Sequence, residues 1–132
     1  MAQLNPYLKF NGNCRQALEF YRSVLGGQLS LQPIGDSPAA GQFPPAMKTS
    51  ILHGSLATDD LTIFGTDVAG PNLTQGNNLF LCLVCKSKEE IETLFSRLSQ
   101  GGKVTTPLRQ EFFGTYGDLV DKFGINWMFQ FA

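Results

Sequence analysis

The sequence predicts an α+β fold of two tandem βαβββ modules that curl around a central cavity. A strand-like segment, a capped amphipathic segment and a Gly-Gly pair occur in that order twice, and the copies lie about 75 residues apart, longer than a solenoid repeat. Clusters of Gly and Pro separate further extended segments after each copy. One helix covers only one face of a four-stranded sheet, so the other faces are free to surround a small-molecule cavity.

Size and composition restrict the class of protein. The 132 residues have the length of one domain, and with a net charge of −1 and 16% charged residues they lack the basic patches that nucleic-acid binding needs. No apolar run has the length of a membrane span, and no secretory signal is recognisable at residues 1–6. Three Cys residues fit reduced thiols. We therefore expect a cytoplasmic protein without a nucleic-acid or membrane partner.

The first module, residues 1–69, contains one helix among four strands. Asn13 and Gln16 have the spacing of a capping box at the start of this helix, and Gly26 with Gly27 ends it. The apolar residues between them recur at helical period. The predicted elements are, in order, a strand over 6–10, a helix over 13–25, and strands over 28–33, 49–56 and 61–66.

The second module, residues 79–132, follows a linker at residues 70–78 and repeats the pattern. Ser87 and Glu90 have capping-box spacing at the start of its helix, and Gly-Gly again follows the helix. Aromatic residues alternate along the last strand, which is typical of a strand face packed under a helix. The predicted elements are a strand over 79–84, a helix over 87–100, and strands over 103–107, 114–120 and 126–131.

These motifs together resemble the vicinal oxygen chelate superfamily, which includes glyoxalase I, extradiol dioxygenases and bleomycin-resistance proteins, and within it the PhnB-like group. The resemblance covers nearly the whole chain. It rests on Pro6-Tyr7-Leu8-x-Phe10-x-Gly12-x-Cys14-x-x-Ala17-Leu18-x-Phe20-Tyr21, Val24-Leu25-Gly26-Gly27, Gly101-Gly102-Lys103-Val104, Pro107-Leu108, Phe113-Gly114, Gly117, Asp121, Phe123-Gly124 and Trp127.

The resemblance implies a homodimer and, in many members, a divalent metal held by His, Glu or Gln side chains from the first and last strands of each module. The corresponding strands here offer only Gln130, and the single His of the chain, His53, lies on a different strand. We therefore expect no bound metal and no cofactor. Bleomycin-resistance members keep this fold without a metal and bind a ligand.

Two functions follow from this resemblance. The first is a metal-independent small-molecule-binding homodimer whose ligand is unassigned. The alternative is a metal-dependent lyase, isomerase or dioxygenase that acts on a substrate with vicinal oxygens. In that enzyme His53, Asp67 and Gln130 would have to converge as metal ligands.

Six side chains are candidates for the ligand cavity. His53 is interpreted either as a structural hydrogen-bonded residue or as a pocket residue. Arg109, and likewise Lys9, can anchor an anionic ligand or be solvated. Aromatic residues ahead of a Gly-punctuated strand can line the cavity or contact the second subunit. The candidates are His53, Arg109, Phe112, Phe113, Tyr116 and Gln130.

Other motifs have structural interpretations. Cys82 and Cys85 have the spacing of a redox or zinc motif, but residues three apart on a strand face opposite sides, so the two sulfurs are badly placed to meet. We therefore expect both to be buried cysteines in apolar surroundings. Cys14 is expected to pack in the first helical turn, with a lowered thiol pKa as the alternative. Asp121 is expected to bond its own turn, with an acid–base pair with Asp118 as the alternative. Residues 35–48 form a long loop that is a lid, a binding loop or disordered at its tip.

Overall fold

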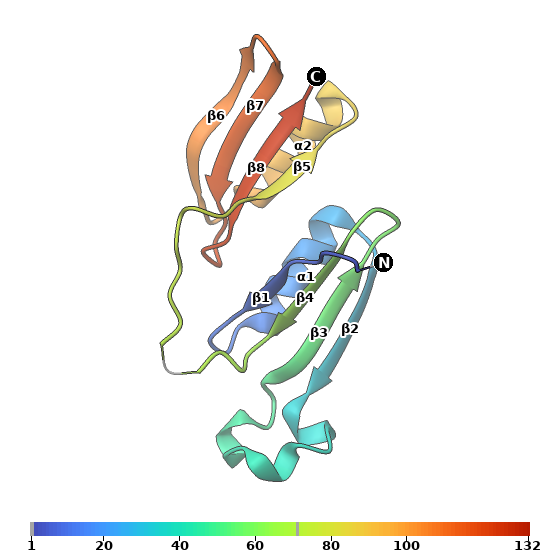
Figure 1. Cartoon of the computed structure of the whole chain (residues 1–132), viewed down its shortest axis with the longest axis vertical. Coiled ribbons are helices and arrows are strands. Elements are labelled where there is room, and N and C mark those ends of the chain that lie inside the picture. Colours follow the sequence, from blue (N-terminus) through green and yellow to red (C-terminus); the bar gives the residue numbers. More distant parts are fainter. Residues whose placement is uncertain (1, 71) are drawn as a thin grey trace. The chain divides into compact units, whose positions relative to one another are not determined.

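A computed structural model describes residues 2–70 and 72–132 of the chain. The chain forms two compact units, Met1–Leu73 and Thr74–Ala132. Each unit has one α-helix and one four-stranded sheet, so the predicted α+β class and the doubled element order are confirmed (Figure 1). Neither helix of the described residues is long and apolar enough to cross a membrane.

Unit 1 contains sheet A, whose strand order is β1-β4-β3-β2. Strand β1 runs parallel to β4, and the other neighbouring pairs are antiparallel. The elements are β1 (Tyr7–Lys9), α1 (Cys14–Leu25), β2 (Gln28–Pro33), three short 3-10 helices (Ile34–Asp36, Ala40–Gln42 and Pro45–Met47), β3 (Ile51–Ala57) and β4 (Thr62–Thr66).

Unit 2 repeats this plan in sheet B, whose strand order is β5-β8-β7-β6 with β5 parallel to β8. The positions of the strands within the order match those of sheet A one for one. The elements are β5 (Leu81–Val84), α2 (Lys88–Leu98), β6 (Lys103–Glu111), β7 (Gly114–Val120) and β8 (Asn126–Phe131).

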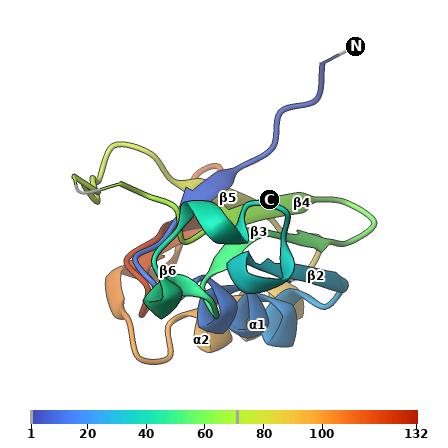
Figure 2. The same cartoon turned by 90° about the horizontal axis from the view of Figure 1, so that it is seen from below.

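Helix α1 packs closely on one face of sheet A because two neighbouring strands present glycines to it. Gly54 on β3 lies opposite Gly65 on β4. A Cβ at Gly54 would lie 2.6 Å from Cδ1 of Leu18, and one at Gly65 would lie 3.0 Å from Sγ of Cys14. Figure 2 shows α1 against this one face of its sheet. The buried side of the helix consists of Cys14, Ala17, Leu18, Tyr21 and Val24.

Helix α2 forms the corresponding core of unit 2. Its Phe95 ring contacts the Phe129 ring edge-on with centroids 5.1 Å apart, and Trp127 and Phe129 are almost fully buried. The aromatic alternation of the last strand is therefore core packing, as predicted. The same geometry leaves the second face of each sheet without an α-helix of its own unit.

The two helices begin differently, and only one predicted capping box is present. In unit 2, Oγ of Ser87 accepts a hydrogen bond from the Glu90 N–H (3.0 Å), and the Glu90 carboxylate accepts one from the Lys86 N–H (2.8 Å). In unit 1, the Asn13 side chain makes no capping bond, so that prediction is wrong. The carboxylate of Asp67 takes its place from a distant part of the chain.

Strand β6 is longer than predicted and continues past Pro107 to Glu111. A proline lacks the N–H that a central strand needs, but β6 is the edge strand of sheet B, where that loss is tolerated. The β6–β7 turn consists of Phe112 and Phe113, followed by Gly114 at φ +125°. A Cβ at Gly114 would clash with the carbonyl oxygen of Phe131, so only glycine fits there.

The long loop between β2 and β3 is ordered into the three 3-10 helices. The Ile34 and Gly35 N–H groups donate to the carbonyls of Ser50 and Lys48, which closes the base of the loop. Ile34 and Ser37 are buried there. The interpretation of a disordered tip is therefore wrong, and the roles of lid and binding loop stay predictions.

Candidate functional site

The helix-free face of each sheet is where side chains point away from the core of its own unit. On sheet A this face carries a cluster of three rings, Tyr7, His53 and Phe64, which we call the aromatic cluster. Strand register places Tyr7 directly beside Phe64. Their centroids are 6.0 Å apart, and the His53 ring lies 5.9 Å from Tyr7 and 5.3 Å from Phe64. The cluster therefore brings together residues of β1, β3 and β4.

The aromatic cluster is accessible rather than part of the core. Tyr7 is 51% exposed, His53 is exposed, and Phe64 is half-buried. The planes of the rings are inclined by 36–47° to one another, so the rings do not stack flat against each other. His53, a predicted cavity residue, thus lies on a helix-free face beside two rings that the sequence analysis did not select.

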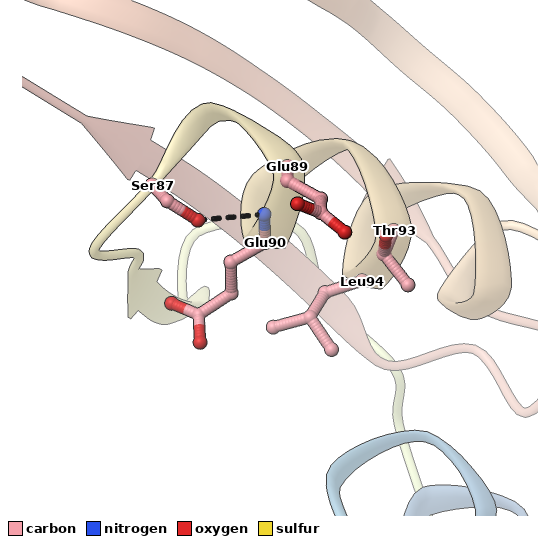
Figure 3. Close-up of a pocket in the computed structure, with 5 residues that line it drawn as sticks. All are labelled: Ser87, Glu89, Glu90, Thr93 and Leu94. Atoms are coloured by element: carbon pink, nitrogen blue, oxygen red, sulfur yellow. Dashed lines mark hydrogen bonds between the residues drawn. The ribbon is translucent and has the colours of Figure 1, made fainter.

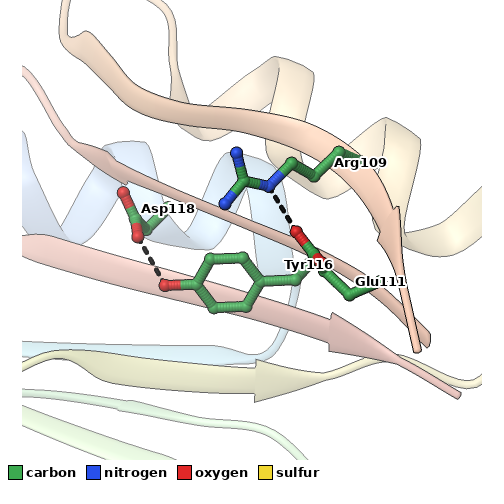
Figure 4. A network of polar contacts seen from close by, with 4 residues as sticks. All are labelled: Arg109, Glu111, Tyr116 and Asp118. Atoms are coloured by element: carbon green, nitrogen blue, oxygen red, sulfur yellow. Dashed lines mark hydrogen bonds and ion pairs between the residues drawn. The ribbon is translucent and has the colours of Figure 1, made fainter. Parts of the chain in front are cut away.

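The helix-free face of sheet B carries a hydrogen-bond network centred on Asp118, the Asp118 network. The Tyr116 hydroxyl donates to one carboxylate oxygen of Asp118 (2.6 Å; Figure 4). The Thr105 hydroxyl donates to the other oxygen. Asp118 is buried, and each of its two oxygens accepts a hydrogen bond from a neighbouring side chain. The network joins β6 to β7 by side chains in addition to the backbone ladder.

The Asp118 network keeps the Asp118 carboxylate ionised and the Tyr116 hydroxyl protonated at neutral pH. Burial alone raises the pKa of Asp118, but hydrogen bonds from Thr105, Tyr116 and Thr106 outweigh it, and the net effect is a lowered pKa. The same hydrogen bond, with burial, raises the pKa of Tyr116 from its usual 10.0 to about 12. At neutral pH the tyrosine proton is committed to Asp118, so the Tyr116 oxygen can only accept from a ligand.

Three predicted cavity residues occupy one row of sheet B. Arg109 on β6 pairs in register with Tyr116 on β7, and Tyr116 pairs with Gln130 on β8. The Arg109 Nε donates to the Glu111 carboxylate at 2.6 Å (Figure 4), so the charge of Arg109 is partly neutralised. The Arg109 side chain is 63% exposed, which keeps its remaining N–H groups available to solvent.

The remaining two candidates lie in the turn beyond that row. The Phe112 and Phe113 rings meet edge to face at 5.2 Å, and Phe113 lies 6.1 Å from Tyr116. Phe112 is 99% exposed and Phe113 is 45% exposed. Five of the six candidates thus belong to the β6–β7 hairpin and β8, whereas His53 belongs to the other unit.

Asp67, one of the three ligands that the alternative function requires, is already engaged in hydrogen bonds within unit 1. Both oxygens of Asp67 are engaged: Oδ1 accepts from the N–H groups of Gly12 (3.0 Å) and Cys14 (2.9 Å), and Oδ2 accepts from that of Ile51 (2.7 Å). His53 lies in the aromatic cluster, and Gln130 belongs to unit 2. Across residues 2–70 and 72–132, no group of three His, Cys, Asp or Glu side chains has metal-binding geometry.

The three cysteines are free thiols. Burial, with a smaller contribution from the nearby Asp67 carboxylate, raises the pKa of Cys14 to about 12. The expectation of a packed thiol is therefore confirmed and the lowered pKa is wrong. Cys85 is buried, with its pKa raised to about 11 by burial and by the charge of Glu90. Cys82 is exposed on the helix-free face, which corrects its predicted burial.

Among the described residues, two of the surface hollows lie away from the helix-free faces. One, of about 300 Å³, is formed by the first turns of α2, where the Ser87–Glu90 capping bond is made (Figure 3). The other, of about 730 Å³, lies where the end of α1 meets the β3–β4 turn, and Asp59 and Asp60 line it. Neither hollow is lined by a predicted cavity residue.

The fold is that of the glyoxalase/bleomycin resistance/dioxygenase proteins. A solved protein of this class from Burkholderia phytofirmans PsJN has a TM-score of 0.64 at 15% identity, with 95% of each chain covered. The chain itself belongs to the family described as 3-demethylubiquinone-9 3-methyltransferase, whose model matches residues 2–130, and so to the PhnB-like group.

Individual relatives cover almost the whole chain. Protein YjdN of Escherichia coli (strain K12) is 29% identical over 135 residues, covering 95% of this chain and 92% of that protein. The crystal structure of protein PA1353 from Pseudomonas aeruginosa is 34% identical, with a TM-score of 0.89 over 100% and 98% of the two chains. A Bacillus cereus structure described as a putative 3-demethylubiquinone-9 3-methyltransferase, PhnB protein, is 25% identical, with a TM-score of 0.78 over 99% and 100%.

Proposed function

We propose that this protein is a metal-independent, small-molecule-binding homodimer of the PhnB-like group, located in the cytoplasm. The observation that carries the proposal is the pair of helix-free sheet faces. Each displays side chains suited to bind an organic molecule: exposed rings on sheet A, and on sheet B the Tyr116 oxygen, which can still accept a hydrogen bond, beside the exposed N–H groups of Arg109. Rings with a few placed polar groups are typical of small-molecule sites.

The occupied carboxylate of Asp67 favours binding without a metal. A metal at Asp67 would have to displace hydrogen bonds from three backbone N–H groups, and each buried donor left unpaired costs about 1–3 kcal/mol. A metal-dependent enzyme is the alternative function. It would require a different conformation of the chain around Asp67.

Exposed apolar side chains support a homodimer. Val84 on the edge strand β5 is 71% exposed, and Leu79 just before this strand is 76% exposed. Phe112 is exposed as well, and exposed apolar side chains at the edge of a sheet are typical of a surface that pairs with another chain. The free thiols are those expected of a protein kept in a reducing compartment.

A thermal-shift screen tests the binding proposal. We expect aromatic or partly apolar small molecules to raise the Tm, because a ligand that binds only the folded state stabilises it by mass action. Ni²⁺, Zn²⁺, Mn²⁺ and Fe²⁺ should leave the Tm unchanged, as should EDTA.

Two results would contradict the proposal. A metal-dependent rise in Tm, reversed by EDTA, would favour the metal enzyme. Turnover of a sulfonium methyl donor would favour the methyl transfer that the family description names.

A further inference from the structure

The aromatic cluster is not required by the core of unit 1. The core lies on the other face of sheet A, where α1 covers Gly54, Leu56, Ile63 and Gly65. Tyr7, His53 and Phe64 alternate with these positions and point away from the helix. Scattered exposed rings are common on protein surfaces, but three rings from three strands within 6.0 Å of one another form a continuous aromatic surface.

A charged side chain lies next to this surface. Lys9 is two residues beyond Tyr7 on β1, so its side chain leaves the same face of the sheet. The four strands of sheet A contain no Asp or Glu. Asp67, the carboxylate that follows β4, has both oxygens bound to backbone N–H groups. Within the described part of the chain, Lys9 makes no ion pair, so its charge is available to a ligand.

The rings and the charge together select a chemical class of ligand. Aromatic faces prefer planar rings, which stack offset or edge-on at centroid distances of about 4.5–7 Å. A Lys ammonium attracts an anionic group, and His53 presents an imidazole N–H in either tautomer. A neutral aromatic ligand would form no ion pair with Lys9, and an aliphatic acid would form no ring contacts with the aromatic cluster.

We infer that the helix-free face of sheet A binds a planar aromatic carboxylate. Its ring contacts Tyr7, His53 and Phe64, and its anionic group lies beside Lys9. The inference rests on the proposed small-molecule-binding function and names the class of ligand and the unit that holds it. Sheet B is not the anion site, because its Arg109 is paired with Glu111 and the Asp118 carboxylate lies nearby.

Binding of 2-naphthoate to the purified full-length protein tests the inference. Side-chain NMR signals of Tyr7, His53 and Lys9 should shift on titration, and signals of Tyr116 and Arg109 should not. Two probes separate the contributions: 2-naphthamide keeps the ring without the charge, and cyclohexanecarboxylate keeps the charge without the ring. Both should bind at least threefold more weakly than 2-naphthoate.

Conservative variants separate a binding role from a folding role. Lys9→Gln removes the charge and should weaken 2-naphthoate binding about threefold to fivefold, the range of an exposed ion pair, with no change for 2-naphthamide. Tyr7→Leu removes one ring and should weaken both aromatic probes about threefold to tenfold. Lys86→Gln in unit 2 and Phe20→Leu on the helix side of unit 1 are the matched controls, which should bind as the unaltered protein does.

Each contrary result has a separate meaning. If 2-naphthoate shifts signals of sheet B instead, or binds Lys9→Gln and Tyr7→Leu unchanged, the inference is wrong and the binding function stands. If 2-naphthoate does not bind and Tyr7 is covered by a second copy of the chain, the aromatic cluster is an interface and the inference is also wrong. If no small molecule of the thermal-shift screen binds, the proposed function fails and the inference fails with it.

Discussion

In unit 1 a carboxylate from outside the helix, Asp67, receives the N–H groups at the start of α1, whereas in unit 2 the helix α2 is capped by its own Ser87 and Glu90. The hairpin turns also differ, because a hydroxyl is the hydrogen-bond acceptor in unit 1 and a carboxylate is the acceptor in unit 2. Thr58 accepts two backbone N–H groups in the β3–β4 turn of unit 1. In the β7–β8 turn of unit 2, Asp121 accepts two backbone N–H groups and the Trp127 indole N–H.

The helix-free faces differ as well. Sheet A presents rings and Lys9, which forms no ion pair with the residues that the structure describes, whereas sheet B presents a buried carboxylate whose oxygens are satisfied. Strand order and helix position are nevertheless the same in both units. The βαβββ backbone therefore tolerates different polar anchors, so the two faces can acquire different binding properties without a change of fold.

The largest expected effect is the loss of the Asp67 anchor. Asp67→Ala leaves the N–H groups of Gly12, Cys14 and Ile51 without their acceptor, and we expect the free energy of unfolding to fall by about 3 kcal/mol. Urea denaturation measures this change. Asp60→Ala in the exposed β3–β4 turn is the control, with an expected change within about 0.5 kcal/mol. An equally small loss for Asp67→Ala would refute its anchoring role.

An intermediate effect is expected from the Asp118 network. Tyr116→Phe removes a hydrogen bond to an ionised carboxylate, which should lower the free energy of unfolding by about 1.5 kcal/mol at neutral pH. Denaturation at fixed pH values measures it. Thr115→Val is the control. It removes an exposed hydrogen bond from the Thr115 hydroxyl to the neutral Gln110 side chain and should lower the free energy of unfolding much less.

The same bond gives stability a pH dependence whose sign can be worked out. The folded-state pKa of Tyr116 is raised, so the native state holds this proton more tightly, and its contribution is complete below pH 10 and lost as pH rises toward about 12. The folded-state pKa of Asp118 is lowered, so its contribution is present above its usual 3.8 and lost as pH falls through the lowered value. Tyr116→Phe should reduce the alkaline loss without abolishing it, because the raised pKa values of Cys14 and Cys85 contribute to the same loss. An unchanged alkaline loss in the variant would contradict the contribution of Tyr116.

The smallest effects compare the two helix starts directly. Ser87→Ala removes an observed cap and should destabilise unit 2 by about 1 kcal/mol. Asn13→Ala removes a side chain that makes no capping bond and should change stability by less than about 0.5 kcal/mol. Equal losses in the two variants, measured by urea denaturation, would contradict the difference between the units.

Local patterns predicted most of the fold because apolar periodicity, glycine pairs and capping residues act within a few residues of one another. Both helices and all eight strands occur where these patterns place them. The missing information was long-range. The Asp67 anchor joins residues 53 and 55 positions apart, and β6 extends past Pro107 because it is an edge strand, which depends on the strand order.

The candidate site was predictable only in part for the same reason. His53, Arg109 and Tyr116 stood out by residue type, but their neighbours are set by strand register. Tyr7 and Phe64 join His53 through the β1–β4 and β3–β4 pairings, and Thr105 reaches Asp118 across the β6–β7 pair. Alternation along each predicted strand was the one available signal, because it places Tyr116 and Asp118 on the same face.

Native mass spectrometry of freshly purified, untagged protein tests the central claim most directly, because it reports the oligomer, bound metal and retained ligand together. We expect a dimer that carries no metal, with any additional mass belonging to an organic molecule that is released on unfolding. A dimer that carries one metal ion per subunit would contradict it and favour the metal-dependent enzyme.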